Sequence, residues 1–307
     1  MTTLPSFVDV KPEVAEALRN GRPVCAMESL IIANPDRLEL SINREKQYNE
    51  ILRGKGVTPA TIAIIGGRVK IGLEPEEVVY LATNGARKCS RRDIPAIIAK
   101  GLDGATTVTG TMIFAAMAGI NTFATGGIGG VHRGAQRTFD ISADMQELGR
   151  TSVAVVASGC KSILDIPLTL EYLETMGVTV VGYKTDEFPS FFARTSGHKV
   201  DYRADNGTEV ARMLAAKRAL NIPGGLLVCN PILEKDALDF HEMDRMINEA
   251  CEEAERDGVG GKELTPYLLE AVVEKSGGRS QLANQALIEN NVSAAGDIAV
   301  AMAEQGL

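Results

Sequence analysis

The sequence predicts an α/β fold with three layers, α/β/α, in which a central, mostly parallel sheet lies between helices and the C-terminal part is helical. Short β-branched or apolar runs recur as far as Asn230, and most are followed by a stretch with helical periodicity. Several runs are apolar at every position, as in strands covered on both faces. Three successive strand-to-helix steps, at residues 60–85, 105–119 and 122–149, are typical of a wound α/β architecture.

Each expected element has a local signal in the sequence. Acidic residues in the first turn and Gly85 at the end delimit one helix, and Pro266 marks the first turn of another. Neither a repeat nor a linker divides the chain, so we expect one α/β domain over residues 1–307. The expected strands are 23–27, 60–65, 69–72, 105–109, a short one from 122, 152–157, 178–182 and 224–229. The expected helices are 12–19, 41–54, 74–85, 94–99, 110–119, one from near Asp140, 168–176, 206–220, 236–257, one from Thr265, and 280–304.

The composition excludes several classes of protein. A hydrophobic fraction of 45% and a charged fraction of 23% are ordinary for a globular domain, and 307 residues can bury a sizeable core. The net charge of −8 argues against nucleic acid as a partner, because phosphate backbones require a basic face. The apolar runs are too short to span a bilayer, so we expect no membrane. The five cysteines are scattered without metal-ligand spacing, which favours reduced thiols in a cytoplasmic protein.

A glycine-rich loop follows the strand that begins at Thr122. Its sequence, GGIGGVHRG, places His132 and Arg133 among five glycines. Glycines allow backbone N–H groups to close around an anion, and the two side chains add positive charge. The order of residues matches neither the dinucleotide fingerprint nor the P-loop, so we expect no nucleotide cofactor. A basic cluster over residues 88–93 could also bind phosphate, although a solvated turn would look the same.

Three carboxylates and a lysine are further candidates. Asp140 and Asp144 have the spacing that places them on one helix face, where they could hold Mg²⁺ or Mn²⁺ or simply complement the helix N-terminus. Glu28 ends a buried strand, at the sheet edge where α/β proteins place their sites, unless it only caps a helix or turn. Lys161 follows another buried strand, where burial near cations favours the neutral, nucleophilic amine; a solvent-exposed lysine is the alternative.

These groups together favour a phosphosugar enzyme. The sequence offers an anion-binding loop, a basic cluster, a lysine suited to a Schiff base, a general acid or base and a site for a divalent cation. The loop at residues 188–194 contains three phenylalanines and could cover the pocket. A non-catalytic phosphosugar-binding regulator is the competing class, but such a protein usually carries a nucleic-acid or partner module.

Several longer motifs make the sequence similar to a known family. The chain resembles the pseudouridine-5′-phosphate glycosidase family, also called indigoidine synthase A-like, over nearly its full length. The resemblance implies an α/β/α fold, a homotrimer, Mn²⁺ or another divalent cation, and the making or breaking of a C–C bond at C1′ of ribose 5-phosphate. The motifs that carry the resemblance are Thr61–Gly67, Ser90–Asp93, Phe123–Gly134, Phe139–Asp144, Lys161–Asp165, Glu171–Thr175 and Asn230–Pro231.

The resemblance also implies roles for individual residues. Lys161 would form a Schiff base with open-chain ribose 5-phosphate, Glu28 would be the proton donor and acceptor, and Asp140 would bind the metal. His132 would lie on the phosphate side of the substrate, and Asn284 would contact the base. The other residues that would line the substrate site are Lys88, Val108, Ser142, Ala143 and Asp144.

One segment departs from the family pattern. The family continues from the glutamate as Glu-Ser-Thr-Ile-x-x-His-Gly, whereas this chain has Leu30, Asn34 and Pro35 at the Thr, His and Gly positions. These changes favour an aromatic acceptor other than uracil. We therefore expect a C-glycosynthase that attaches ribose 5-phosphate to an aromatic natural-product precursor, with the pseudouridine-5′-phosphate glycosidase reaction, giving uracil and ribose 5-phosphate, as the alternative.

Overall fold

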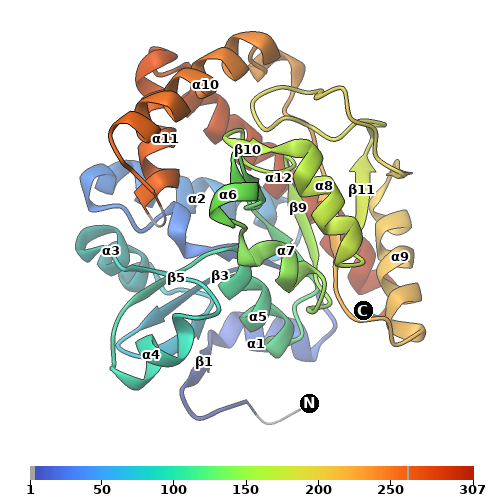
Figure 1. Cartoon of the computed structure of the whole chain (residues 1–307). Helices are drawn as coiled ribbons and strands as arrows, with labels where there is room; N and C mark the ends of the chain where they lie inside the picture. The colour runs from blue at the N-terminus through green and yellow to red at the C-terminus, as the bar shows by residue number, and fades with distance from the viewer. Residues whose placement is uncertain (1–3, 261–262) are drawn as a thin grey trace.

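The computed structural model describes residues 4–260 and 263–307 and confirms the α/β class. The described residues contain an eleven-stranded sheet whose main path has the order β1-β4-β3-β2-β7-β9-β13-β11-β12, with β5 and β6 attached beside β3. Most neighbouring strands are parallel, and β3 is antiparallel to both β4 and β6. Helices lie in front of and behind the central strands (Figure 1). The expected three layers are therefore present.

The central strands are short and buried. Each of β2, β7, β9 and β13 is buried at every position, because helices cover both faces. A small two-stranded antiparallel sheet, β8 with β10, stands apart. The strands are β1 Val8–Val10, β2 Val24–Glu28, β3 Thr58–Ile65, β4 Arg68–Ile71, β5 Arg87–Cys89, β6 Gly104–Thr106, β7 Thr122–Ala124, β8 Val131–His132, β9 Ala154–Ala157, β10 Leu164–Asp165, β11 Thr179–Tyr183, β12 Tyr202–Ala204 and β13 Leu226–Cys229.

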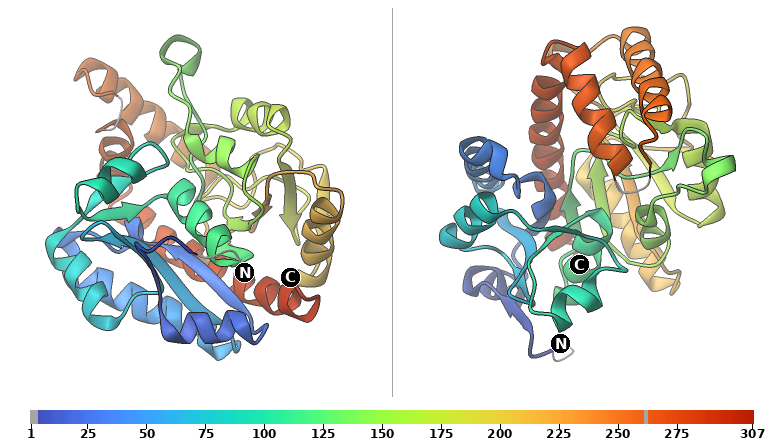
Figure 2. Two further views of the ribbon diagram at one scale, coloured as in Figure 1. Left: turned by 90° about the horizontal axis from the view of Figure 1, so that it is seen from below. Right: turned by 60° about the vertical axis from the view of Figure 1, so that its left-hand side comes forward.

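The C-terminal helix α12 packs along one face of the sheet, against β2, β7 and β9, between α2 and α9. Helix α5 packs on β2, β3 and β7 from the other side and contacts α7 (Figures 1 and 2). Helices α10 and α11 pack together above this layer. The helices are α1 Pro12–Arg19, α2 Leu38–Gly54, α3 Pro75–Asn84, α4 Ile94–Ala99, α5 Val108–Ala118, α6 Ala135–Thr138, α7 Ala143–Leu148, α8 Ile166–Thr175, α9 Gly207–Ala219, α10 Phe240–Arg256, α11 Leu264–Lys275 and α12 Arg279–Glu304.

Some boundaries differ from the sequence-based prediction. The strand expected at 105–109 ends at Thr106, because Thr107 already caps α5. The helix expected from near Asp140 begins at Ala143, where the Ser142 side chain accepts a hydrogen bond from the backbone N–H of Asp144. Short strands β1, β5, β8, β10 and β12 were not expected. They have two or three residues each, too few for a period to show in the sequence.

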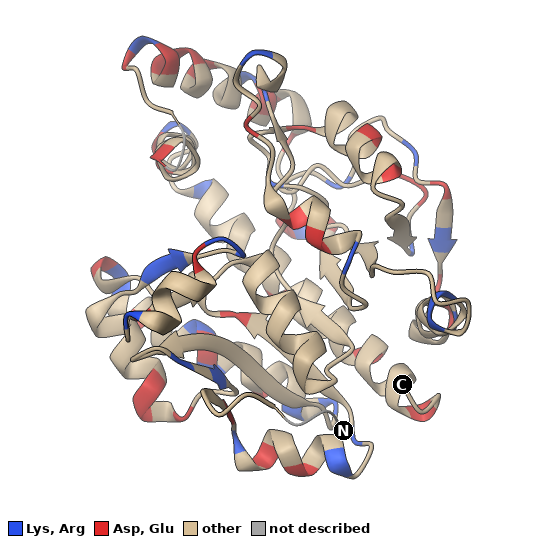
Figure 3. Cartoon of the chain, turned by 60° about the horizontal axis from the view of Figure 1, so that its bottom comes forward, with Lys and Arg blue, Asp and Glu red and all other residues tan. Residues whose placement is uncertain are grey.

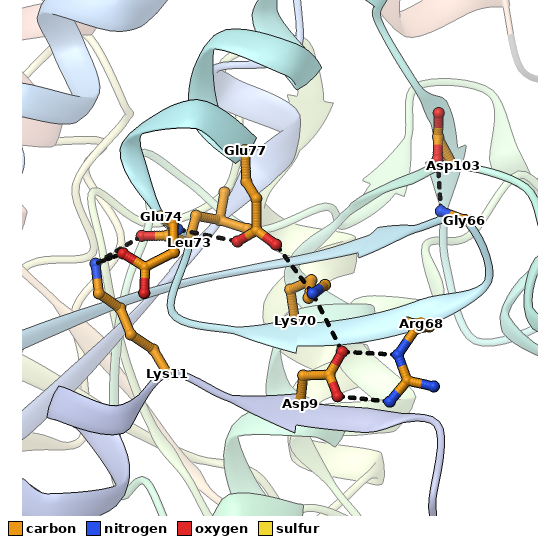
Figure 4. A network of polar contacts seen from close by, with 9 residues as sticks. All are labelled: Asp9, Lys11, Gly66, Arg68, Lys70, Leu73, Glu74, Glu77 and Asp103. Carbon is orange, nitrogen blue, oxygen red and sulfur yellow. Dashed lines mark hydrogen bonds and ion pairs between the residues drawn. The ribbon is translucent and has the colours of Figure 1, made fainter.

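One edge of the sheet is held by ion pairs between β1, β4 and α3 (Figure 4). Arg68 donates two hydrogen bonds to Asp9, at 2.6 and 2.8 Å, and Lys70 bridges Asp9 and Glu77. The Arg68 guanidinium is the main reason that the pKa of Asp9 falls to about 2. Lys11 pairs with Glu74 at the start of α3. Charged groups on an edge strand discourage pairing with another sheet.

Charge is confined largely to the outside of the molecule. Acidic and basic segments alternate over the outer helices, and the central strands carry few of either (Figure 3). None of the helices in the described ranges is long and apolar enough to cross a membrane. Several of the buried polar side chains lie at the ends of the central strands, where they form the candidate site.

Candidate active site

Four polar residues lie at the carboxyl ends of neighbouring parallel strands. Glu28 ends β2, Thr125 follows β7, Ser158 follows β9 and Asn230 follows β13. These strands are adjacent in the sheet and run in the same direction, so the four residues meet at one edge. Open α/β sheets place their ligands at this edge. The sequence rule that singled out Glu28 would also have found Thr125, Ser158 and Asn230.

Asn291 of α12 connects three of these strand ends. Its Nδ2 group donates to the carbonyl of Thr125 at 2.8 Å and lies 3.1 Å from Ser158 Oγ. Its Oδ1 atom accepts from Asn230 Nδ2 at 3.0 Å. Asn291 is fully buried, so each of these partners would lack a hydrogen bond without it. Its neighbour Asn290 donates to the carbonyl of Pro231. The side-chain amides of both asparagines, which are costly residues inside a helix, are therefore used.

Glu28 is a buried carboxyl group with one short hydrogen bond. Thr125 Oγ1 donates to Glu28 Oε1 at 2.5 Å, and only 4% of Glu28 is exposed. Next to it, Ser29 Oγ accepts from the backbone N–H of Thr106 at 2.9 Å, which fixes the strand exit. Burial raises the pKa of Glu28, and the Lys161 charge and the Thr125 hydroxyl oppose that shift. A protonated carboxyl group can therefore persist here and act as an acid.

Lys161 is half-buried, and its backbone is fastened to the glycine-rich loop. Its N–H donates to the carbonyl of Ile128 at 3.0 Å, and the N–H of Ile128 donates to the carbonyl of Gly159 at 3.1 Å. Gly159 has φ +74°, and a Cβ there would collide with Pro189 and Phe188. Glycine is therefore required at this turn. The charge of Lys161 contributes to the pKa shifts of Glu28, Lys88 and His132, so these side chains lie near one another.

The glycines of the loop at 126–134 allow close packing. A Cβ on Gly129 would collide with Ser142 and Asp144, one on Gly127 would lie 2.7 Å from the Phe191 ring, and one on Gly130 would collide with Thr169. The backbone N–H groups of residues 128, 129, 131 and 132 all donate to other protein groups. Those four N–H groups are not available to the anion that the sequence suggested, so the loop acts mainly as a tightly packed support.

Asp140 and Asp144 have different surroundings. Asp144 is buried and accepts hydrogen bonds from the N–H of Thr109 at 3.0 Å, from Thr109 Oγ1 at 2.5 Å and from the N–H of Gly129 at 2.8 Å. Asp140 lies before α7, and its carbonyl accepts from the N–H of His132. The prediction that both aspartates share one helix face is therefore wrong, because the Ser142 cap starts the helix later. Asp144 joins α5 to the loop, and the Asp140 carboxylate stays free of hydrogen bonds from the described residues.

Two of the basic residues that the sequence suggested for anion binding, Arg91 and Arg133, are paired with other groups of the protein. Arg91 makes two hydrogen bonds to the buried Glu147, at 2.7 and 2.8 Å, and Arg133 binds Asp244 and Asn248 of α10. Both arginines are therefore occupied elsewhere. Lys88 on β5 is exposed as a residue, and partial desolvation of its amine and the Lys161 charge lower its pKa, against the pull of Asp144, Glu28 and Asp140.

His132 is half-buried in β8, beside Asp140. Desolvation lowers the pKa of its imidazole, while the Asp140 carboxylate opposes that shift. We expect a neutral ring at pH 7, able to donate one hydrogen bond and accept another. Lys88, His132 and Asp140 together can present a cation, a neutral donor and a carboxylate to a phosphorylated ligand.

The other expected site residues surround this cluster. Val108 is the first residue of α5, directly before the Asp144 partner Thr109, and not part of a strand. Ser142 caps α7, and Ala143 is its first residue. Asn284 is half-buried on α12, one turn before Ile288, the residue that a Cβ on Gly126 would meet at 3.1 Å. Its amide is therefore on the helix face that packs toward the loop.

The three phenylalanines of the 188–194 segment are buried, although Ser190 and Ala193 of the same segment line a cavity. Phe188, Phe191 and Phe192 are all at most 3% exposed and pack into the core. Phe191 has φ +54°, an unusual conformation for a bulky residue, and its ring lies against Gly127. The segment therefore supports the glycine-rich loop from behind. The sequence-based suggestion that this loop covers a pocket therefore applies to Ser190 and Ala193 and not to the phenylalanine rings.

The side chains near Asp140 suit a metal ion that keeps several water ligands better than a metal ion that is held by protein ligands alone. No cluster of three or more His, Cys, Asp or Glu side chains able to hold a metal occurs within residues 4–260 and 263–307. Asp140 offers one free carboxylate, and Asp144 has both oxygens engaged. Mg²⁺ and Mn²⁺ accept one carboxylate together with waters and substrate phosphate, whereas zinc requires several protein ligands. A hard divalent cation therefore fits at Asp140.

The sequence matches one protein family over most of its length. The family of indigoidine synthase A-like proteins matches residues 13–301. A pseudouridine-5′-phosphate glycosidase from Clostridium botulinum is 52% identical over 98% of this chain and 99% of its own length. The pseudouridine-5′-phosphate glycosidase of Escherichia coli K12 is 50% identical over 96% of this chain and 95% of its own.

Solved structures of similar proteins show the same fold. The prealnumycin C-glycosynthase AlnA, solved in complex with ribulose 5-phosphate, superposes with a TM-score of 0.92 at 38% identity and covers 99% of both chains. An indigoidine synthase A-like protein from Thermotoga maritima gives a TM-score of 0.88 at 35% identity, also over 99% of both chains.

The Thr125 hydrogen bond predicts a measurable change in Glu28. Because this hydrogen bond favours the ionised carboxylate, Thr125→Val should raise the pKa of Glu28 further above its value in the unmodified protein. The titration can be followed by infrared spectroscopy as the carboxyl band that Glu28→Gln removes.

Thr122→Val is the matched control. Thr122 is fully buried on β7, and its hydroxyl has no partner among the described residues. Its replacement should leave the Glu28 titration unchanged. A Glu28 pKa that falls, or stays constant, in Thr125→Val would contradict the assigned hydrogen bond.

Proposed function

The chain belongs to the family of indigoidine synthase A-like proteins, and from this premise we propose that it is a pseudouridine-5′-phosphate glycosidase. The observation that carries the proposal is the buried acid Glu28 at the sheet edge, close enough to Lys161 for the lysine charge to oppose the upward shift of its pKa. The enzyme would break the C–C bond at C1′ and release uracil and ribose 5-phosphate. The homotrimer implied by the family resemblance remains a prediction.

The comparisons favour cleavage over the synthetic reaction that the sequence first suggested. The relatives that are about half identical over nearly the whole chain are glycosidases. The C-glycosynthase has a very similar fold but is only 38% identical. C-ribosylation of an aromatic acceptor stays the second candidate, because it uses the same bond and the same groups in the reverse direction.

The residues that depart from the family pattern, Leu30, Asn34 and Pro35, favoured the synthetic reaction, but two of them have another structural role. Asn34 is exposed, and its Oδ1 atom caps a short 3₁₀ helix by accepting from the N–H of Asp36 at 3.1 Å. Pro35 packs beside Gly85, where an added Cβ would lie 3.1 Å from its ring. Both residues therefore serve the start of α2. Leu30, half-buried two residues after Glu28, is the one substitution that remains beside the site.

The reaction we propose uses Lys161 as the nucleophile. Its neutral amine would attack C1′ of pseudouridine 5′-phosphate and displace the ring oxygen, which takes the proton that the attacking nitrogen loses. Glu28 would give its proton to the uracil carbon as the C–C bond breaks, and the nitrogen lone pair would form the imine at C1′. Water would then hydrolyse the imine to ribose 5-phosphate and free Lys161. Lys88 and His132 would bind the phosphate side, and Asn284 the base.

Asp140 would hold Mn²⁺ or another divalent cation in our proposal. The free carboxylate beside His132 supports this assignment. The ion would supply positive charge to the phosphosugar when bound. The residues of the chain would still perform the proton transfers, with Asp144 fixing the position of the loop.

Uracil release from pseudouridine 5′-phosphate tests the proposed function. The unmodified enzyme should release it, and borohydride added during turnover should leave one reduced pentose phosphate on Lys161. Lys161→Arg should lower kcat by at least about 1,000-fold, since a guanidinium stays protonated and cannot form the imine.

Lys100→Arg, at an exposed helix end, is the matched control and should keep full activity. An enzyme that releases no uracil but joins ribose 5-phosphate to an aromatic acceptor would establish the synthetic reaction instead. A borohydride adduct that persists in Lys161→Arg would refute the role of the lysine.

Chelation tests the metal. Removal of divalent ions should lower kcat/KM, and Mn²⁺ should restore it. Asp140→Asn should weaken Mn²⁺ binding by about tenfold or more, measured as bound Mn²⁺ by electron paramagnetic resonance, because a neutral amide replaces the single carboxylate. Asp186→Asn, at an exposed carboxylate, should bind Mn²⁺ like the unmodified protein. Equal Mn²⁺ binding by all three proteins would show that Asp140 is not the ligand.

A further inference from the structure

A cavity of about 240 Å³ lies at the edge of the sheet opposite to the active site. Its walls come from the second half of α9 and from the first residues of three parallel strands, Thr179 of β11, Tyr202 of β12 and Leu226 of β13. The catalytic groups follow the carboxyl ends of the strands, whereas these residues begin their strands. The cavity therefore shares no residue with the active site.

Large apolar side chains around this cavity are exposed. Tyr202 is 57% exposed, Leu220 69% and Ile222 48%, and all three line the cavity together with Met213. A single exposed apolar residue is ordinary on a protein surface, but several around one cavity mark a binding site. An occupant with an apolar body would remove this surface from water.

Lys217 supplies the charge of the cavity. Among the described residues that line the cavity, it is the only charged one. It is 8% exposed, and its Nζ donates to the carbonyl of Gly225 at 3.2 Å and to that of Gly177 at 3.4 Å. Burial lowers the pKa of the amine, and no acidic side chain in the described ranges raises it again. Because buried charges in proteins are usually paired, this one lacks a counter-charge.

The Lys217 amine can bind one further group. An ammonium has three N–H donors, and two of them are used by the two carbonyls. One of those carbonyls belongs to Gly177, an exposed residue, so the amine lies near the surface, in the wall of the cavity. A carboxylate on the occupant would accept the third hydrogen bond and supply the missing negative charge.

We propose that this cavity binds an aliphatic monocarboxylate, such as a medium-chain fatty acid. The carboxylate pairs with the Lys217 ammonium, and the alkyl chain lies against Met213, Leu220 and Ile222. One water occupies about 30 Å³ in the liquid, so the cavity accommodates about eight groups of that size, as in octanoate. The proposal uses none of the residues of the proposed catalytic reaction and does not depend on it.

Titration of the full-length protein with octanoate, followed by calorimetry, tests the proposal. We expect one site per chain with a Kd of about 1 mM or lower, as for a ligand of this size. The affinity should fall about fourfold for each CH₂ group that is removed, in hexanoate and butanoate, because each buried CH₂ contributes a similar amount. 1-Octanol has the same chain and no charge, and it should bind about tenfold more weakly or worse.

Substitutions locate the binding. Leu220→Glu places a carboxylate at the exposed rim and should weaken octanoate binding about fivefold or more, because like charges repel and an apolar contact is lost. Leu282→Glu, the same change at a residue of α12 that is 71% exposed and does not line the cavity, is the matched control and should bind octanoate like the unmodified protein. Lys217→Met, which removes the charge, should lower the affinity for octanoate to that for 1-octanol.

Three outcomes would overturn the proposal: no saturable binding of octanoate, equal affinity for octanoate and 1-octanol, or equal octanoate affinity in Leu220→Glu and Leu282→Glu. Circular dichroism checks that each variant is folded. If Lys217→Met does not fold, the comparison of octanoate with 1-octanol in the unmodified protein decides whether a charge is recognised, and Leu220→Glu decides where.

Discussion

The site depends on the hydrogen bonds of Asn291. This fully buried side chain holds the ends of β7, β9 and β13 together through the Thr125 carbonyl, Ser158 and Asn230. Thr125 in turn donates to Glu28 at the end of β2. Loss of the amide would remove this partner from the buried Thr125 carbonyl and Asn230 amide, at about 1–3 kcal/mol for each group, whereas Ser158 would keep its hydrogen bond to the Asn230 carbonyl. One asparagine on the last helix therefore helps to set the position of an acid near the start of the chain.

Close packing supplies the second constraint. The glycine-rich loop lies so near to Ser142, Thr169 and Phe191 that side chains on Gly129, Gly130 and Gly127 would collide with them. Asp144 then fastens the loop to α5, and Ile128 fastens it to the backbone of Lys161. Rigid support of this kind keeps catalytic groups in a fixed geometry before substrate arrives, which reduces the cost of organising them during the reaction.

The sequence predicted the α/β class, the main strands and the sheet edge that carries the site, because buried strands and polar residues at strand exits leave clear local patterns. It did not predict that Arg91 and Arg133 are occupied by Glu147 and α10, since such pairs join residues far apart in the chain. The spacing of Asp140 and Asp144 predicted that they share one helix face, but α7 begins only after the Ser142 cap, so Asp140 lies outside the helix. The role of Asn291 was equally hidden, because its partners come from three separate strands.

Replacement of Asn291 tests the account most directly. Asn291→Ala should lower the free energy of unfolding by about 2–4 kcal/mol and, at a temperature where the protein is still folded, lower kcat for uracil release by about tenfold or more, because Glu28 loses its support through Thr125. Asn290→Ala, one residue away and with a side chain that donates to the Pro231 carbonyl, should cost less stability and leave kcat nearly unchanged. Equal effects of the two substitutions on both quantities would contradict the account.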